Sequence, residues 1–219
     1  MSAKGRIFIF EGLDGAGKTT HVGTLSDALK EAGHTVEVFR EPGGTPYGEE
    51  LRNLLVKRPF GDLDPMTETF LLMASRRILI NWVRERWEKG VSVIIDRFVF
   101  STYAYQCCGK NLPVQALLDM YDYASTDLPP IDHIIYMVNE KKKEPEDEIE
   151  RAYFDKRSKI HSGFEQLFNP HNWTAGSIFM QHRNTPVLRV DITGADKSQI
   201  PAFAELINTT VLNSLSQRT

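Results

Sequence analysis

The chain has 219 residues, of which 41% are hydrophobic and 25% are charged. This composition supports one compact α/β domain and argues against a disordered chain or a large multidomain protein. Lys and Arg total 26 against 29 Asp and Glu, so the formal net charge is -3. The overall charge therefore gives no reason to expect a nucleic-acid partner. The two cysteines, Cys107 and Cys108, are adjacent and badly placed for a disulfide, which predicts a reducing, cytoplasmic location. No apolar window approaches the roughly 20 residues of a membrane span, so we expect a soluble protein without a membrane partner.

Short apolar segments alternate with segments of helical periodicity along the chain. We predict strands at residues 5–10, 35–39, 91–95, 133–138 and 187–190. Helices are predicted between them, at residues 18–32, 49–56 and 67–89, in two stretches before Pro129 and Pro130, and at residues 198–215. Because parallel strands need crossover connections, this order predicts a five-stranded parallel sheet flanked by helices on both faces. Ligands are then expected at the carboxyl ends of the strands.

A phosphate-binding loop follows the first predicted strand directly. Residues 12–19 (GLDGAGKT) match G-x-x-x-x-G-K-[ST] between a strand and a helix. The glycines let backbone N–H groups converge on phosphate oxygens, and the next helix points its positive end at them. Lys18 is expected to reach the outer phosphates and the Thr19 hydroxyl to bind Mg²⁺. The predicted ATP-binding residues are Gly12, Gly15, Ala16, Gly17, Lys18, Thr19 and Thr20.

Other loops distinguish among the classes of nucleotide-binding protein that share this motif. The third predicted strand ends in Asp96 and Arg97, an acid and a guanidinium beside the phosphates. Residues 139–142 (NEKK) follow the fourth predicted strand but lack the Lys and Asp of the N-K-x-D motif expected of a GTP switch. A motor or nucleic-acid ATPase usually needs a longer chain and a basic face. The pattern therefore favours a small-molecule kinase.

Five segments in a fixed order resemble the thymidylate kinases, a family of the nucleoside monophosphate kinase group. They are EGLDGAGKTT at 11–20, REPGGT at 40–45, FLLMASR at 70–76, DRFVFSTYAYQ at 96–106 and IERAYF at 149–154. The resemblance implies the three-layer P-loop kinase fold, as one domain over residues 1–219 with a mobile lid at about 140–160. It also implies a homodimer and a Mg²⁺-dependent enzyme that transfers the γ-phosphate of ATP to dTMP, giving dTDP and ADP, in dTTP biosynthesis.

We expect catalytic roles for Asp14, Lys18, Arg97 and Arg151. Asp14 is expected beside the 3′-hydroxyl of dTMP, although Asp also serves as a structural cap in such turns. Arg97 is expected to bind the dTMP phosphate and Asp96 to support Mg²⁺ or its waters. The alternative for Asp96 and Arg97 is a salt bridge at the end of the strand, which would contribute little stability if exposed.

The base-binding side of the site is expected on the helix at 67–89. Arg76 stands where the family places an arginine that hydrogen-bonds thymine, and a shift of one residue would substitute Arg77. Leu72 stands where most relatives carry a stacking Phe. Phe70, Leu72 and Met73 are equally compatible with plain core packing.

Further substrate contacts are implied on two loops. Tyr105 is expected to exclude a ribose 2′-hydroxyl. The predicted substrate-binding residues are Asp14, Glu41, Pro42, Leu72, Arg76, Arg97, Ser101, Thr102, Tyr105 and Gln106.

The lid departs from the family pattern. Where relatives read D-R-I-E, residues 147–150 read DEIE, so Glu148 replaces the expected arginine. We favour Arg151 as the cation that stabilises the transferred phosphoryl group, with Lys156, Arg157 and the lysines at 141–143 as alternatives.

Two other functions remain open from the sequence. A deoxynucleoside kinase shares the phosphate loop and a D-R motif but needs a general base for a neutral 5′-hydroxyl. A non-catalytic nucleotide-binding regulator is compatible with the altered lid. Whether dUMP or dGMP is also accepted is not encoded in a recognisable motif.

Overall fold

A five-stranded parallel sheet forms the centre of the molecule. The computed structural model describes residues 4–57, 61–140, 154–168, 181–182 and 184–216. The strands are β1 (Ile7–Glu11), β2 (Val36–Arg40), β3 (Ser92–Asp96), β4 (His133–Val138) and β5 (Val187–Asp191), in the spatial order β2-β3-β1-β4-β5. Every pairing between neighbouring strands is parallel. The predicted α/β fold with five parallel strands is therefore confirmed.

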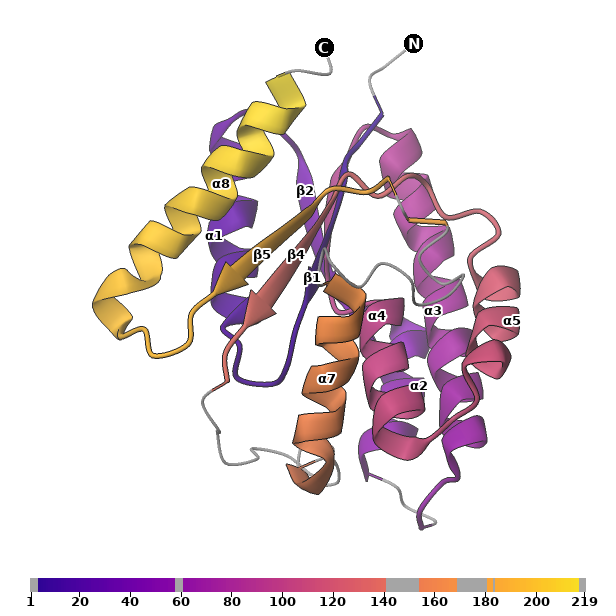
Figure 1. Cartoon of the computed structure of the whole chain (residues 1–219). Coiled ribbons are helices and arrows are strands. Elements are labelled where there is room, and N and C mark those ends of the chain that lie inside the picture. Colours follow the sequence, from indigo (N-terminus) through magenta and orange to yellow (C-terminus); the bar gives the residue numbers. More distant parts are fainter. Residues whose placement is uncertain (1–3, 58–60, 141–153, 169–180, 183, 217–219) are drawn as a thin grey trace.

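Helices cover both faces of this sheet (Figure 1). On one face lie α1 (Lys18–Glu31) and α8 (Ile200–Ser216). On the other side lie α2 (Pro46–Lys57), α3 (Pro65–Glu88), α4 (Val99–Thr102), α5 (Val114–Ala124) and α7 (Arg157–Phe168). Shorter helical pieces are η1 (Tyr103–Cys108), which continues α4, η2 (Phe154–Lys156) and η4 (Lys197–Gln199). None of the helices in the described ranges is both long enough and apolar enough to cross a membrane.

Alternate side chains of β1 supply two separate cores. Ile7 and Ile9 belong to the cluster formed with α3, α4, α5 and α7, whereas Phe8 and Phe10 belong to the cluster formed with α1 and α8. All four side chains are fully buried. Because a strand points successive residues to opposite faces, a continuous apolar run is what a central strand with helices on both sides requires.

The long helix α3 begins earlier than the apolar periodicity predicts. Asp64 caps it by accepting hydrogen bonds from the backbone N–H groups of Met66 and Thr67, and Pro65 occupies the first helical position. Pro lacks the N–H that would be unpaired there, so the Asp-Pro pair marks the helix start. The apolar pattern used for the prediction begins only at Thr67, inside the first turn.

Three adjacent strands end at one edge of the sheet. β1 ends at Glu11, β3 at Asp96 and β2 at Arg40, and these strands lie side by side in the order β2-β3-β1. The segments predicted to be functional follow these strand ends directly. The fold therefore brings the phosphate loop, the Asp96-Arg97 turn and the loop at 41–45 to a common edge.

Candidate active site

The loop at residues 12–17 joins β1 to α1 in a conformation that needs glycine. Gly12, Gly15 and Gly17 have φ angles of 136°, 77° and 78°. A Cβ atom on Gly12 would lie 2.2 Å from the Met137 carbonyl oxygen, so no other residue fits there without movement. Gly17 caps α1 without a side-chain hydrogen bond, and the first turn carries no acidic residue. The helix start therefore leaves its backbone N–H groups available to an anion.

Lys18 turns back over this loop. Its Nζ donates hydrogen bonds to the carbonyl oxygens of Gly12 at 3.1 Å and Leu13 at 2.8 Å. Burial lowers the pKa of Lys18 to about 8, and the nearby Arg97 cation acts in the same direction. The ammonium group thus lies within the loop, where phosphate oxygens would replace the carbonyls as partners.

Arg97 reaches the same loop from the end of β3. Its backbone is left-handed, with φ at 72°, and its N–H donates to the Phe10 carbonyl at 2.8 Å. One guanidinium nitrogen, Nη1, donates to the Gly12 carbonyl at 2.9 Å and to Ser101 Oγ at 3.1 Å, while Nη2 pairs with the Asp14 carboxylate. Lys18 and Arg97 therefore both bond the carbonyl oxygen of Gly12.

Asp14 lies between two other predicted site residues. Its carboxylate pairs with Arg97 and accepts a hydrogen bond from the Tyr105 hydroxyl at 2.7 Å. Burial would raise the pKa of Asp14, but the cations Arg97 and Lys18 hold it below its ordinary value. The alternative of a salt bridge between Arg97 and Asp96 is not what the structure has. Asp96 Oδ1 is instead a buried oxygen without a hydrogen-bond partner among the described residues.

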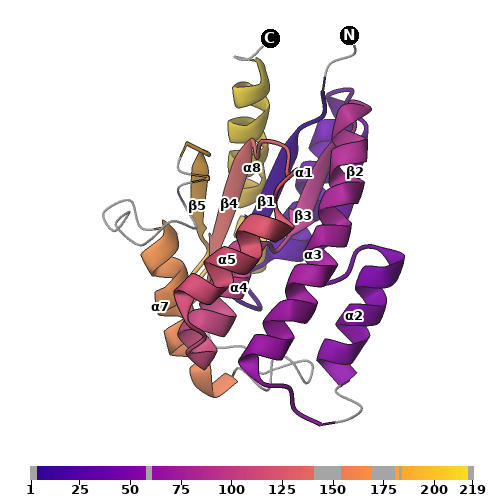
Figure 2. The ribbon, with the colours of Figure 1, turned by 90° about the vertical axis from the view of Figure 1, so that its right-hand side faces the viewer.

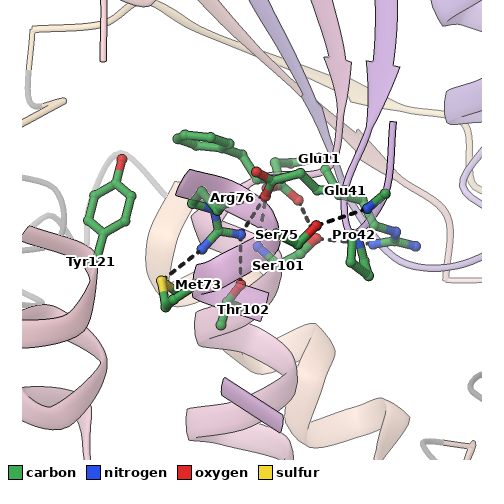
Figure 3. Close-up of polar contacts among 12 residues, drawn as sticks. Glu11, Glu41, Pro42, Met73, Ser75, Arg76, Ser101, Thr102 and Tyr121 are labelled. Carbon is green, nitrogen blue, oxygen red and sulfur yellow. Dashed lines mark hydrogen bonds and ion pairs between the residues drawn. The ribbon is translucent and has the colours of Figure 1, made fainter. Parts of the chain in front are cut away.

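Arg76 is buried beside the end of β2 and fixed by several groups (Figure 3). Its Nε donates to Glu41 Oε2 at 2.8 Å, and Nη2 donates to Glu41 Oε2 at 2.5 Å and Thr102 Oγ1 at 3.0 Å. Nη1 contacts Met73 Sδ at 3.5 Å, a weak acceptor. The side chain therefore joins α3, the loop after β2 and α4.

The neighbouring Arg77 lies elsewhere. It pairs with Asp127 at the surface, with a 2.8 Å distance between Nη2 and Oδ2. This arrangement favours Arg76 over Arg77 as the residue available to a base. Of the three apolar residues before it, Met73 is buried in the core, Leu72 is half-buried and Phe70 is 58% exposed. Core packing therefore explains Met73 but not Phe70.

The other predicted substrate-binding residues are spread around these two arginines. Ser101 and Thr102 are buried on α4 and contact Arg97 and Arg76, respectively. Pro42 is half-buried, and its carbonyl accepts a hydrogen bond from Arg52 at 3.2 Å. Gln106 is buried one turn further along and donates to Glu68 at 3.1 Å, so it joins η1 to α3. In the phosphate loop, Ala16 is buried, whereas Gly15, Thr19 and Thr20 are exposed.

From the region of the predicted lid, Arg157 at the start of α7 reaches the phosphate loop. Its guanidinium donates to the Asp14 carbonyl at 3.3 Å and to the Asn139 carbonyl at 3.4 Å. Asn139 itself donates to the Gly15 carbonyl at 3.1 Å. Arg151 and Glu148 lie outside the described residues. Asn139 was not predicted as a site residue, since a single amide after a strand carries no recognisable motif.

Comparison with known proteins agrees with the resemblance. A family model described as "Thymidylate kinase" matches residues 10–175. The chain belongs to this family. A thymidylate kinase from Thermoanaerobacter sp. (strain X514) is 34% identical over 173 residues, which cover 75% of this chain and 84% of that protein. One from Chlorobaculum tepidum is 40% identical over 159 residues, 72% of each chain. One from Bordetella petrii is 41% identical over 131 residues, 59% of this chain and 62% of the relative, so that match spans less than two thirds of its length.

Solved thymidylate kinase structures have the same fold. The protein from Ehrlichia chaffeensis superposes with a TM-score of 0.68 at 24% identity, over 97% of this chain and 99% of the other. The protein from Candida albicans gives a TM-score of 0.69 at 20% identity, over 98% and 95% of the two chains. The family and the P-loop kinase fold predicted from the sequence are confirmed, and so is the enzyme class, a thymidylate kinase that phosphorylates dTMP to dTDP.

Proposed function

We propose that the chain transfers the γ-phosphoryl group of ATP directly to dTMP, with Lys18 binding the donor phosphates and Arg97 the acceptor phosphate. The observation that carries this proposal is that both cations bond one oxygen, the Gly12 carbonyl, at 3.1 and 2.9 Å. Two anionic substrates repel each other, so a site that joins them needs positive charge from two directions. Lys18 comes from the start of α1, and Arg97 comes from the turn after β3.

Because the proposed acceptor is a nucleoside monophosphate, the site needs no buried general base. A monophosphate already carries its nucleophilic oxygen, so the chain has to align the two phosphates and neutralise the charge that spreads over the transferred group. The helix start at Gly17, Lys18 and Arg97 supply these interactions. We infer a single in-line transfer without a covalent enzyme intermediate.

A magnesium ion fits the residues at the loop. Thr19 is exposed at the first turn of α1, and Asp96 Oδ1 is a buried carboxylate oxygen that no described residue hydrogen-bonds. Hydroxyl and carboxylate oxygens suit Mg²⁺, which is usually held by few protein groups together with substrate phosphates and water. When bound, the ion neutralises phosphate charge. Thr19 and Asp96 would hold it, directly or through water.

The base is read by Arg76. Glu41 and Thr102 fix its Nε and Nη2, whereas the one partner of Nη1 in the described part of the chain is the Met73 thioether. A guanidinium held in this way offers a donor to a carbonyl oxygen such as O4 of thymine, and it disfavours the amino group of cytosine at the same position. Glu41 thus acts on the substrate through Arg76.

The sugar lies beside Asp14 and Tyr105. The carboxylate is held below its ordinary pKa, so it is an acceptor at neutral pH and suits a 3′-hydroxyl donor. The Tyr105 ring also lies under the Arg97 guanidinium, with 5.4 Å between the guanidinium carbon and the ring centre. This arrangement supports Tyr105 as the group that fills the space of a ribose 2′-hydroxyl.

On the lid side, the contacts support Arg157 alongside the cation that we favour from the sequence, Arg151. Arg157 already lies against the loop through the Asp14 carbonyl, and its charge contributes to lowering the pKa of Asp14. Arg157 Nη1 lies 3.3 Å from the Asp14 carbonyl oxygen, so this cation can approach the transferred phosphoryl oxygens without a large movement of α7.

A coupled ADP-release assay across nucleoside monophosphates tests the proposed reaction. We expect turnover with dTMP, weaker turnover with dCMP, and none with thymidine. Turnover with thymidine but not dTMP would identify a deoxynucleoside kinase instead. Binding of ATP and dTMP without turnover would identify a regulator.

We also propose a cytoplasmic homodimer. Tyr47 and Leu54 on α2 and Phe70 on α3 are 75%, 41% and 58% exposed, and these two helices lie side by side (Figure 2). Large apolar side chains exposed on two neighbouring helices favour burial against a second copy. Sedimentation equilibrium of the wild type and of Phe70→Asp tests this, since a dimer through this face is expected to dissociate in the variant. Both cysteines are free thiols, which suits the cytoplasm.

A further inference from the structure

Glu11, the last residue of β1, is a fully buried carboxylate that touches the active-site turn. It accepts hydrogen bonds from the backbone N–H of Phe98 at 2.7 Å, from the N–H of Ser101 at 3.1 Å and from Ser101 Oγ at 2.6 Å. Glu11 lies within the segment at 11–20, but no motif in the sequence gives it a role. An acid buried in this way is costly unless its oxygens are well satisfied.

The hydrogen-bond partners of Glu11 lie at the start of one helical segment, which Glu11 therefore holds in place. The helical segment formed by α4 and η1 begins after Phe98, which caps it without a side-chain hydrogen bond. Its first N–H groups therefore need acceptors from elsewhere. Glu11 supplies them from a strand 87 residues earlier in the chain. It thus fixes the start of the helix that carries Ser101, Thr102 and, further along, Tyr105.

Arg97 is connected to this contact in two ways. It is the residue directly before Phe98, and its left-handed backbone, with φ at 72°, turns the chain from β3 into α4. Its Nη1 also donates to Ser101 Oγ at 3.1 Å, and the same hydroxyl donates to Glu11. The result is a hydrogen-bonded chain from Glu11 through Ser101 to Arg97, which ends on the phosphate loop.

We propose that Glu11 is a positioning residue that sets the orientation of the Arg97 guanidinium and thereby the affinity for the acceptor phosphate. The proposal rests on the proposed function, in which Arg97 binds the phosphate of dTMP. Glu11 itself contacts neither substrate. Its effect is expected on the acceptor side, because Lys18, which serves the donor, makes its two hydrogen bonds to loop carbonyls and none to Glu11 or Ser101.

The variant Glu11→Gln tests this, since the amide keeps the shape of the side chain and one acceptor oxygen. Its NH₂ group cannot accept the Ser101 hydroxyl hydrogen, so the connection to Arg97 changes while part of the helix cap remains. We expect kcat/KM for dTMP to fall about tenfold, because the hydrogen bond from Ser101 Oγ to Glu11 Oε2 is lost. KM for ATP should stay within about twofold of the wild type.

Asp132→Asn is the matched control. Asp132 is also a buried carboxylate, and it accepts the backbone N–H of Ile7 at 2.9 Å and pairs with Arg6 at the opposite end of β1. The same acid-to-amide change there should leave both kinetic constants within about twofold, even if the melting temperature falls. An equal loss of dTMP kinetics in both variants would refute a positioning role and leave Glu11 as a structural residue.

A double-mutant cycle with Arg97→Ala gives the second readout. If Glu11 acts through Arg97, Glu11→Gln should cost less than about twofold further once Arg97 is absent. A full tenfold loss in both backgrounds would overturn the proposal. Should Glu11→Gln fail to fold, Ser101→Ala replaces it in the cycle, because it breaks the same hydrogen-bonded chain while Glu11 keeps both backbone partners.

Calorimetric titration of dTMP separates this inference from the proposed function. A wild type that binds dTMP but does not phosphorylate it would refute phosphoryl transfer, while the Glu11 and Asp132 variants could still be compared by affinity. An active wild type with unchanged dTMP affinity in Glu11→Gln would refute only the role of Glu11.

Discussion

Replacing Arg97 by Lys is the sharpest test of how the acceptor phosphate is bound. The change keeps one positive charge but removes the planar group whose two nitrogens serve different partners. Nη1 bonds Gly12 and Ser101, and Nη2 pairs with Asp14. A single ammonium nitrogen cannot occupy both positions.

The expected loss follows from these contacts. A hydrogen bond to a charged group contributes about 1.5–3 kcal/mol, so losing one arm of the guanidinium lowers kcat/KM for dTMP roughly 100-fold. Arg97→Ala removes the charge as well and should cost about tenfold more. The left-handed backbone, with φ at 72°, does not distinguish the two variants, because Lys and Ala carry a Cβ as Arg does.

Steady-state kinetics with dTMP as the varied substrate measures this loss. Arg77→Lys is the matched control, since Arg77 pairs with Asp127 at the surface, where such pairs contribute little. The control should stay within about twofold of the wild type. If Arg97→Lys were within about threefold of the wild type, Arg97 would contribute charge only and the two-pronged grip would be refuted.

Four further predictions address the loop, the sugar, the lid and the buried acid. Lys18→Ala should reduce turnover at least about 100-fold with little change in melting temperature, and a variant retaining more than a tenth of the rate would contradict the phosphate role. Tyr105→Ala should narrow the preference for dTMP over the ribonucleotide by about 1–3 kcal/mol in kcat/KM, whereas an unchanged ratio would place the sugar filter elsewhere. Arg157→Ala should lower kcat with little effect on KM for ATP. Arg151→Ala is measured in the same assay, and if only one of the two variants is impaired, the residue replaced in that variant is the cation that acts. Burial raises the pKa of Glu11 to about 7 from 4.5, so the free energy of unfolding should fall by on the order of 3 kcal/mol as the pH rises through this range. Urea denaturation should show this dependence for the wild type relative to Glu11→Gln, and parallel profiles would contradict it.

Much of the fold and of the loop could be predicted because their signals are local. A buried parallel strand needs a continuous apolar run such as residues 7–10, and a loop that wraps phosphates needs glycine at Gly12, Gly15 and Gly17. These requirements concern residues that are neighbours in the chain, so a short segment of sequence is enough to show them. The order of five such segments was enough to identify the family. The start of α3 was missed by two residues because its cap, Asp64, lies before the apolar pattern.

The partners of the charged residues were decided only by the tertiary structure. The sequence could not distinguish Arg76 from Arg77, yet their directions on α3 bury one against Glu41 and leave the other with Asp127 at the surface. Arg97 pairs with Asp14, which lies 83 residues away, and not with its neighbour Asp96.

Arg157 and Glu11 reach the site over still longer separations along the chain. Arg157 contacts the Asp14 carbonyl across 143 residues, and Glu11 contacts Ser101 across 90. The sequence by itself determined the order of the motifs along the chain, the phosphate loop and the family. Which side chains meet at the loop depends on which strands are neighbours in the sheet and on how α3, α4 and α7 pack against it, and no local pattern encodes those distances.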